Sequence, residues 1–194
     1  MRNRSPIYLS LIIPAKNEAA RIPATLERYD SFFGKQGMRF EIIVVVNGCS
    51  DRTEAVVREF AEKHPAVRCR VYAEPIGKGG ALIQGVKAAA GERVCFADAD
   101  GSASPDTLLR LVRSMGIADG AIGSRWLPQS VITRAQPLHR RIISRVFNVI
   151  VRLLLDLPYA DTQCGAKVFR RTALGAVLYE LDITGLTFDV SLLD

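Results

Sequence analysis

Two aspartates one residue apart, Asp98 and Asp100, directly follow an apolar segment and precede a Gly-Ser-Ala-Ser-Pro turn. Side chains at positions i and i+2 of an extended segment point to the same side of the chain, so both carboxylates can bind one cation. Mg²⁺ and Mn²⁺ favour hard oxygen ligands, usually keep waters and take further ligands from substrate phosphates. The pair therefore predicts a metal that holds a diphosphate, with a cap on the following turn or helix as the simpler alternative.

Two other polar clusters follow apolar segments earlier in the chain. In the first, Pro14 to Glu18, Asn17 could cap a helix that has Glu18 in its first turn. The same residues could line a nucleotide pocket, and we expect both roles. In the second, Asn47 to Asp51, the Asn-Gly pair is typical of a turn with positive φ and Asp51 could cap a helix, while Asn47 could equally hydrogen-bond the edge of a nucleobase.

A glycine-rich stretch, "EPIGKGGALIQG", lies between these clusters and the aspartate pair. It fits neither G-x-x-x-x-G-K-[ST] nor G-x-G-x-x-G, so a P-loop and a dinucleotide-binding turn are both weak interpretations. Lys78, near the start of a predicted helix, could still contact phosphate, helped by backbone amides and the helix dipole.

The elements that must position these residues alternate along the chain. Short β-branched apolar segments predict strands at Ile7–Ile13, Phe40–Val46, Val67–Ala73 and Arg93–Ala97. Helical patterns lie between them at Ala19 to about Phe33, Arg52–Lys63 and Gly79–Ala90. This alternation predicts an α/β fold, a mostly parallel sheet with helices on both faces. Because ligands bind at the carboxyl ends of such strands, the three polar clusters should converge on one crevice.

The remainder of the chain is predicted to hold a loop over this crevice and a helix with a basic face. A helix from Pro105 to about Met115 and a short strand, Gly120–Gly123, lead into a long loop without a clear period. Residues 138–157 then form a mostly apolar helix with arginines gathered on one side, a pattern suited to a membrane interface and too charged for a transmembrane span. An ordinary core helix is the main alternative, and nucleic acid is not an expected partner, because no aromatic stacking platform accompanies the arginines.

The composition excludes some classes of protein but does not identify a binding partner. A length of 194 residues suits a single domain, and 48% hydrophobic residues exclude disordered and fibrous classes. The formal net charge of +6 favours an anionic partner such as a nucleic acid, a membrane surface or a phosphorylated substrate. The four widely spaced cysteines favour reduced thiols in a cytosolic protein, and the apolar run near the N-terminus lacks the features of a signal peptide.

An ordered set of motifs resembles the family 2 glycosyltransferases, which have the GT-A fold, and within them the dolichyl- and polyprenyl-phosphate glycosyltransferases. The motifs are "SLIIPAKNEAARI", "GKGGALIQG", "FADADGS", "AIGSRW", "DTQCGAKVFRR" and "TFDVSLL". Each alone is unspecific, whereas their order and spacing together are specific. The resemblance runs from about Leu9 to the final residue and implies one catalytic domain over residues 1–194.

The resemblance also implies roles for particular residues. It implies a nucleotide pocket lined by Pro14, Ala15, Lys16, Glu18, Val45, Asn47, Lys78, Asp98 and Ala99. It implies Asp100, with Asp98, as the ligands of Mg²⁺ or Mn²⁺, Ser102 close by, and Arg125 as a contact to phosphate. Asp161 is a candidate acceptor-site residue or base. The candidates for binding the acceptor phosphate are Arg134, His139, Arg141 and Arg145.

Two departures from the family pattern affect these expectations. Many relatives have aspartate where this chain has Asn47, which weakens the inference that the base is uracil. The chain also stops at Asp194 within an apolar run where relatives continue, so we expect a shortened domain that lacks part of the acceptor site.

The expected function is an inverting, metal-dependent transfer of a hexose, with glucose favoured, from a UDP-sugar to a polyprenyl phosphate at the cytoplasmic membrane face. Metal and basic groups would stabilise charge on the leaving UDP. The alternatives are a soluble family 2 glycosyltransferase with a saccharide or small phosphorylated acceptor, a nucleotidyltransferase, and a non-catalytic membrane-binding module.

Overall fold

The computed structural model describes residues 6–124, 161 and 164–178 of the chain. Its strands are β1 (Leu9–Ala15), β2 (Phe40–Asn47), β3 (Val67–Tyr72), β4 (Arg93–Phe96), β5 (Gly120–Ile122) and β6 (Lys167–Arg170). Its helices are α1 (Ile22–Gly34), α2 (Thr53–Lys63), α3 (Gly77–Ala88), α4 (Pro105–Ser114) and α6 (Arg171–Val177). Residues outside the described ranges include the predicted helix at 138–157, Arg125, Arg134, His139, Arg141 and Arg145.

The strands form one six-stranded sheet in the order β3-β2-β1-β4-β6-β5. Strands β1 to β4 pair in parallel, whereas β6 lies antiparallel between β4 and β5. The predicted mostly parallel sheet is therefore confirmed. The sequence analysis placed no strand at residues 167–170, which join the sheet beside β4 although about 70 residues separate them in the chain.

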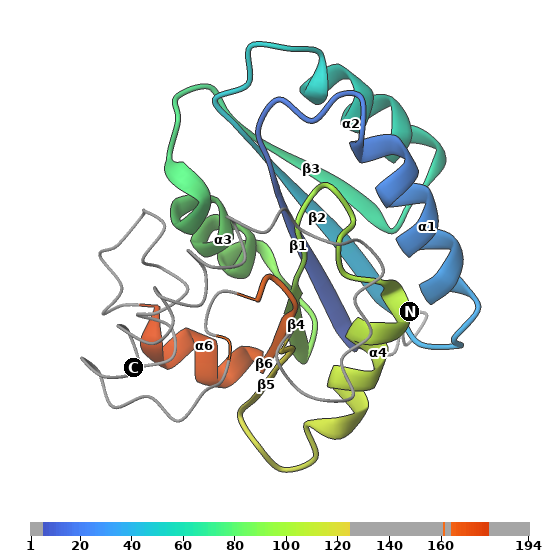
Figure 1. The fold of residues 1–194 in the computed structure, drawn as a ribbon, viewed down its shortest axis with the longest axis vertical. Coiled ribbons are helices and arrows are strands. Elements are labelled where there is room, and N and C mark those ends of the chain that lie inside the picture. Colours follow the sequence, from blue (N-terminus) through green and yellow to red (C-terminus); the bar gives the residue numbers. More distant parts are fainter. Residues whose placement is uncertain (1–5, 125–160, 162–163, 179–194) are drawn as a thin grey trace, which may run out of the picture.

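Helices cover both faces of the sheet, as the alternation predicts (Figure 1). One core cluster joins β1, β2 and β4 to α1, α2 and α4, and a second joins the opposite face of the same strands to α3 and α6. Leu11 and Ile13 of β1 point into the first cluster and Ile12 into the second, which is the alternation of a strand buried on both sides. The parallel strands therefore hold their carboxyl ends at one edge between two packed layers.

Two element boundaries shift for identifiable reasons. β1 ends at Ala15, two residues later than expected, because β2 pairs with it over that whole length. Pro14 is tolerated there because β4 pairs with β1 only as far as Ile12. α1 begins at Ile22 with Pro23 in its first turn, so the prediction that Asn17 caps this helix is wrong.

A buried polar cluster holds the amino-terminal ends of the strands. The Glu41 carboxylate is 3% exposed and accepts hydrogen bonds from Ser10 Oγ, Arg68 and the backbone N–H of Ala90, each at 2.7 Å. Ser10 Oγ in turn accepts the Gly91 N–H at 2.9 Å. This cluster ties β1, β2 and β3 to the turn after α3, at the end of the strands opposite the polar loops.

Candidate active site

A narrow crevice with almost no free volume lies at the carboxyl ends of the central strands. Its lining residues are Pro14, Lys78, Leu82, Phe96, Ala97, Asp98 and Gly165. These residues come from β1, α3, β4 and the segment before β6, so residues predicted from three separate motifs meet here. Of the three polar clusters expected to converge, Pro14 of the first and Asp98 of the third line this crevice, whereas no residue of Asn47 to Asp51 does.

Asp98 and Asp100 occupy different environments within residues 98–104, here called the acidic segment. Asp98 Oδ1 lies 3.0 Å from Lys78 Nζ, an ion pair in which both side chains are about one-third exposed. Asp100 is exposed, and its Oδ1 accepts the Ser102 N–H at 2.9 Å. No other hydrogen bond or ion pair in the described part of the chain engages the Asp100 carboxylate. Asp100 is therefore open to a ligand, while Asp98 is held against α3.

The donor set of the acidic segment fits a small divalent cation that shares its coordination with a substrate. Within the residues described here, no group of three or more histidine, cysteine or acidic side chains is placed to bind a metal. Two carboxylates can supply only part of the coordination shell that Mg²⁺ or Mn²⁺ requires, which is how such ions bind when phosphates and waters complete the shell.

The loops after β1 and β2 are joined by hydrogen bonds. Asn17, with φ of 55°, accepts the Ser50 N–H on its side-chain oxygen at 2.9 Å. The Glu18 N–H donates to Thr53 Oγ1 at 2.8 Å, and the Ala19 N–H donates to Asp51 Oδ2 at 3.1 Å. Asn17 thus braces the neighbouring loop, which explains why its side chain is absent from the start of α1.

Asp51 joins this network through the first turn of α2. Its Oδ1 accepts both the hydroxyl and the backbone N–H of Thr53, at 2.5 and 2.9 Å. The hydroxyl hydrogen bond, with the backbone N–H bonds beside it, lowers the pKa of the Asp51 carboxyl. Asp51 therefore remains a charged acceptor. Through its hydrogen bond with Ala19 it holds the loop after β1, which contains Lys16 and Glu18.

Asn47 uses both ends of its amide within the protein. Its Nδ2 donates to the Gly77 carbonyl at 3.0 Å, and its Oδ1 accepts the Ile76 N–H at 2.7 Å. The residue is 4% exposed. In this arrangement Asn47 fastens β2 to the start of α3, and it also fixes the backbone that carries Lys78.

The other predicted donor-site residues differ in their exposure to solvent. Lys16 is exposed and Glu18 half-buried, where it forms a two-pronged ion pair with Arg21 at 2.7 Å. Val45 is completely buried and packs beneath α3, so its side chain is shielded from the crevice. Ala15 and Ala99 are also buried.

The segment that leads into β6 contains Asp161, which was predicted from the sequence, and also Gly165 and Lys167, which the sequence analysis quoted only as part of a motif. Asp161 is 2% exposed and Lys167 is completely buried, with Lys167 Nζ donating to the Cys164 carbonyl at 2.8 Å. A Cβ at Gly165 would overlap Asp98 Oδ2 and lie 3.1 Å from Asp98 Cγ. The signal that could have found Gly165 and Lys167 is an acidic and a basic residue flanking a glycine in the quoted motif.

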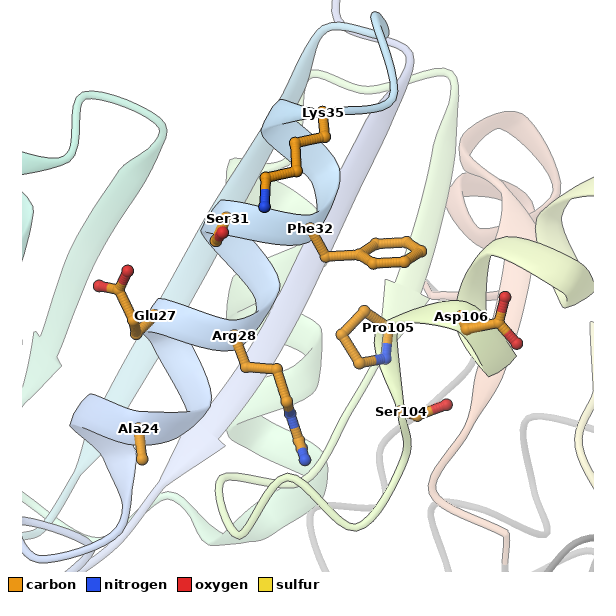
Figure 2. A pocket seen from close by; sticks show the side chains of 9 residues that line it. All are labelled: Ala24, Glu27, Arg28, Ser31, Phe32, Lys35, Ser104, Pro105 and Asp106. Atoms are coloured by element: carbon orange, nitrogen blue, oxygen red, sulfur yellow. The ribbon is translucent and has the colours of Figure 1, made fainter.

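A larger and shallower hollow of about 580 Å³ lies between α1 and α4 (Figure 2). Phe32 and Pro105 face each other across it, and Arg28 extends from α1 toward the acidic segment (Figure 2). None of its lining residues was predicted from the sequence to bind the donor. The smaller crevice is instead lined by predicted donor-site residues, namely Pro14, Lys78 and Asp98.

The fold is that of the GT-A glycosyltransferases. Residues 10–178 match the profile of glycosyl transferase family 2, and the chain belongs to that family. It is 35% identical to the dolichyl-phosphate β-glucosyltransferase of Drosophila melanogaster, covering 96% of this chain and 62% of that protein. It is 33% identical to glycosyltransferase AglD of Haloferax volcanii, covering 96% of this chain and 30% of that protein. The chain thus spans less than two thirds of the length of these relatives.

Solved structures share the fold at lower sequence identity. The glucosyl-3-phosphoglycerate synthase of Mycobacterium tuberculosis in complex with UDP superposes with a TM-score of 0.68 at 23% identity, covering 96% of this chain and 64% of that chain. A mannosyltransferase from Pyrobaculum calidifontis, in complex with GDP-Man and Mn²⁺, gives a TM-score of 0.59 at 24% identity over 90% of this chain and 49% of that chain. Among the described residues, no helix combines the length and apolar character needed to cross a membrane.

Proposed function

We propose that this chain supplies the donor-binding part of an inverting glycosyltransferase that transfers a hexose, with glucose favoured, from a UDP-sugar to a polyprenyl phosphate. The observation that carries the proposal is the crevice in which Lys78 of α3 and Asp98 of the acidic segment meet at the carboxyl ends of the sheet. The similarity to dolichyl-phosphate β-glucosyltransferases over nearly the whole chain supports the choice of acceptor and sugar.

In this proposal the acidic segment and Lys78 receive the donor diphosphate. Asp100, which is exposed, is assigned as the metal ligand, and Asp98 as a second ligand or a contact to ribose. A bound Mg²⁺ or Mn²⁺ would neutralise charge on the departing nucleoside diphosphate. Lys78 would exchange its contact with Asp98 for a phosphate oxygen, a change that needs only local side-chain movement because its Nζ already lies at the crevice.

The base of the nucleotide is assigned to the loops after β1 and β2. These loops are rigidly joined through Asn17, Ser50 and Asp51, so they present fixed backbone groups to a ligand. Asn47 would act there chiefly by holding Ile76 and Gly77 in place. UDP remains the favoured nucleotide, and the titration below compares it with GDP.

The transfer itself exchanges one bond at the anomeric carbon for another. The acceptor phosphate oxygen attacks the anomeric carbon from the face opposite the diphosphate, the bond to the diphosphate oxygen breaks with its electron pair, and UDP leaves. A phosphate acceptor is already anionic, so proton removal is not essential, and Asp161 is assigned an orienting role or that of a base. Arg125, Arg134, His139, Arg141 and Arg145 remain predicted phosphate contacts, and the helix at 138–157 a predicted contact with the cytoplasmic membrane face.

A soluble transferase with a small phosphorylated acceptor is the second candidate. It is favoured by the fold shared with glucosyl-3-phosphoglycerate synthase, which has been solved with Mn²⁺, UDP-glucose and phosphoglyceric acid. Both candidates use the same donor crevice and differ in acceptor. Transfer assays with radiolabelled UDP-glucose and either polyprenyl phosphate in vesicles or 3-phosphoglycerate therefore distinguish them.

The first test is calorimetric titration of UDP, GDP and UDP-glucose, with and without Mn²⁺, into the full chain and into Asp100→Asn. We expect metal-dependent binding of UDP that is at least tenfold weaker in the variant, because one carboxylate ligand is removed. Asp106→Asn, an exposed carboxylate on α4, is the matched control and should bind as the unaltered chain does. Tighter binding of GDP would redirect the proposal to mannosyl transfer, and no nucleotide binding by folded protein would refute it.

A further inference from the structure

The backbone of the acidic segment is held by side chains of α1. Three donors on one helix face reach three alternate carbonyl oxygens: Thr25 Oγ1 to Ala99 at 2.9 Å, Arg28 to Gly101, and Tyr29 Oη to Ala103 at 2.8 Å. Residues spaced by three and four positions lie on the same side of a helix, which is why one face of α1 can supply all three. We call Thr25, Arg28 and Tyr29 the α1 clasp.

The clasp satisfies polar groups that the sheet does not reach. β4 ends at Phe96, so the carbonyls of the acidic segment have no strand partner. Thr25 is 4% exposed and Tyr29 is completely buried, so their hydrogen bonds form where water does not compete. The acidic segment is therefore fixed chiefly by side chains that lie more than 70 residues earlier in the chain.

Gly101 allows the acidic segment to approach α1 closely. Its φ is +64°, and a Cβ there would overlap the Arg28 guanidinium and lie 2.9 Å from Thr25 Oγ1. The backbone turns at this point through the Gly101 N–H, which donates to the Asp98 carbonyl at 3.0 Å. The clasped carbonyls at Ala99 and Gly101 thus flank Asp100 directly.

The charges of the clasp and of the acidic segment also affect the pKa of Tyr29. Burial raises the pKa of the Tyr29 phenol, with Arg28 opposing the rise and the carboxylates of Asp98 and Asp100 adding to it. The phenol therefore stays protonated and remains a donor to Ala103. The coupling also indicates that both carboxylates lie within electrostatic range of the clasp.

We propose that the α1 clasp positions Asp98 and Asp100 for metal-dependent donor binding, an inference that rests on the proposed function of the acidic segment. Carboxylates that share a cation must keep their spacing within about 0.5 Å, and a loop without strand partners cannot do so unaided. Thr25, Arg28 and Tyr29 are positioning residues, because their contacts with the acidic segment are to its backbone. Loss of a clasp contact should weaken metal-dependent binding while leaving metal-independent binding of the nucleotide unchanged.

The test compares Tyr29→Phe, Thr25→Val and Arg28→Met with Ser31→Ala, an exposed residue on the same helix that, among the described residues, makes no hydrogen bond to the acidic segment. UDP is titrated with and without Mn²⁺, Mn²⁺ binding is followed separately by electron paramagnetic resonance, and amide hydrogen exchange is measured over residues 98–104. We expect each clasp variant to lose about tenfold in metal-dependent affinity and to exchange faster in the acidic segment, with Ser31→Ala unchanged. Tyr29→Phe keeps the ring and its packing, so it reports the hydrogen bond even if Arg28→Met folds poorly.

The outcomes separate this proposal from the proposed function. Clasp variants that melt earlier yet keep full Mn²⁺ binding and metal-dependent UDP affinity would reduce the clasp to a purely structural contact and overturn it. If the unaltered chain binds no nucleotide, the proposed function fails, and Mn²⁺ resonance and hydrogen exchange still decide the clasp. Unchanged exchange over residues 98–104 in all three variants would then overturn it.

Discussion

Gly165 shows how a residue without a side chain can control a charged one. It lies beside Asp98 Oδ2 on one side, while Lys78 holds Asp98 Oδ1 on the other at 3.0 Å. Asp98 therefore has one position between α3 and the segment before β6. Lys167, whose Nζ holds the Cys164 carbonyl, keeps that segment in place.

The variant Gly165→Ala should displace Asp98, because the new Cβ would overlap its carboxylate oxygen. We expect about tenfold weaker metal-dependent UDP binding in a titration, with a small loss of stability. Gly175→Ala is the matched control, since a Cβ at this helical glycine meets nothing within 4 Å. Equal UDP affinity in Gly165→Ala and the unaltered chain would show that Asp98 has no part in donor binding.

At the scale of elements, the two ends of the parallel strands carry different kinds of polar groups. The carboxyl ends carry exposed groups for ligands, and the amino ends are closed by the buried cluster around Glu41. A buried carboxylate is tolerated there because it accepts three hydrogen bonds, one of them from a cation. The buried polar cluster and the groups that we assign to ligand binding thus lie at opposite ends of the strands.

The variant Glu41→Ala should destabilise the fold by about 2–4 kcal/mol, because it leaves the buried donors of Ser10 and Ala90 without an acceptor. Urea unfolding with a linear extrapolation measures the change. Arg68 is partly exposed and can turn to water, so its charge adds little to the loss. Glu62→Ala, on the exposed side of α2, should change stability by less than about 0.5 kcal/mol, and a similar effect of both variants would contradict the role of the cluster.

For the whole molecule, Tyr29 of the clasp should make the free energy of unfolding depend on pH in the alkaline range. Burial places the pKa of Tyr29 above its ordinary value, so the folded protein holds that proton more tightly than the unfolded chain does. The stability contributed by this group is complete below the pKa of an unfolded tyrosine, about 10, and falls as pH rises through the folded value.

Unfolding by urea at several pH values should therefore show a steeper loss of stability above about pH 10 in the unaltered chain than in Tyr29→Phe. At neutral pH the variant should be about 1 kcal/mol less stable, because it lacks the hydrogen bond to Ala103. Parallel curves for the two proteins across the alkaline range would mean that the phenol titrates alike in the folded and unfolded states.

Much of this architecture is readable from local patterns. The apolar segments predict β1 to β4, their alternation with helices predicts a parallel sheet covered on both faces, and the motif order indicates family 2. The motifs also single out Lys78 and Asp98, which meet at the carboxyl ends of the strands. These features depend on residue periodicity and on the geometry of parallel strands, which a sequence carries within short windows.

Only the tertiary structure decided how these residues are held. Asn47 bonds to the start of α3, β6 enters the sheet beside β4 in the antiparallel sense, and the α1 clasp reaches the acidic segment across about 74 residues. Each contact joins groups whose own neighbours in the chain give no sign of the partner. Hydrogen bonds depend on distances of about 3 Å, and only the packing of the helices on the sheet sets those distances.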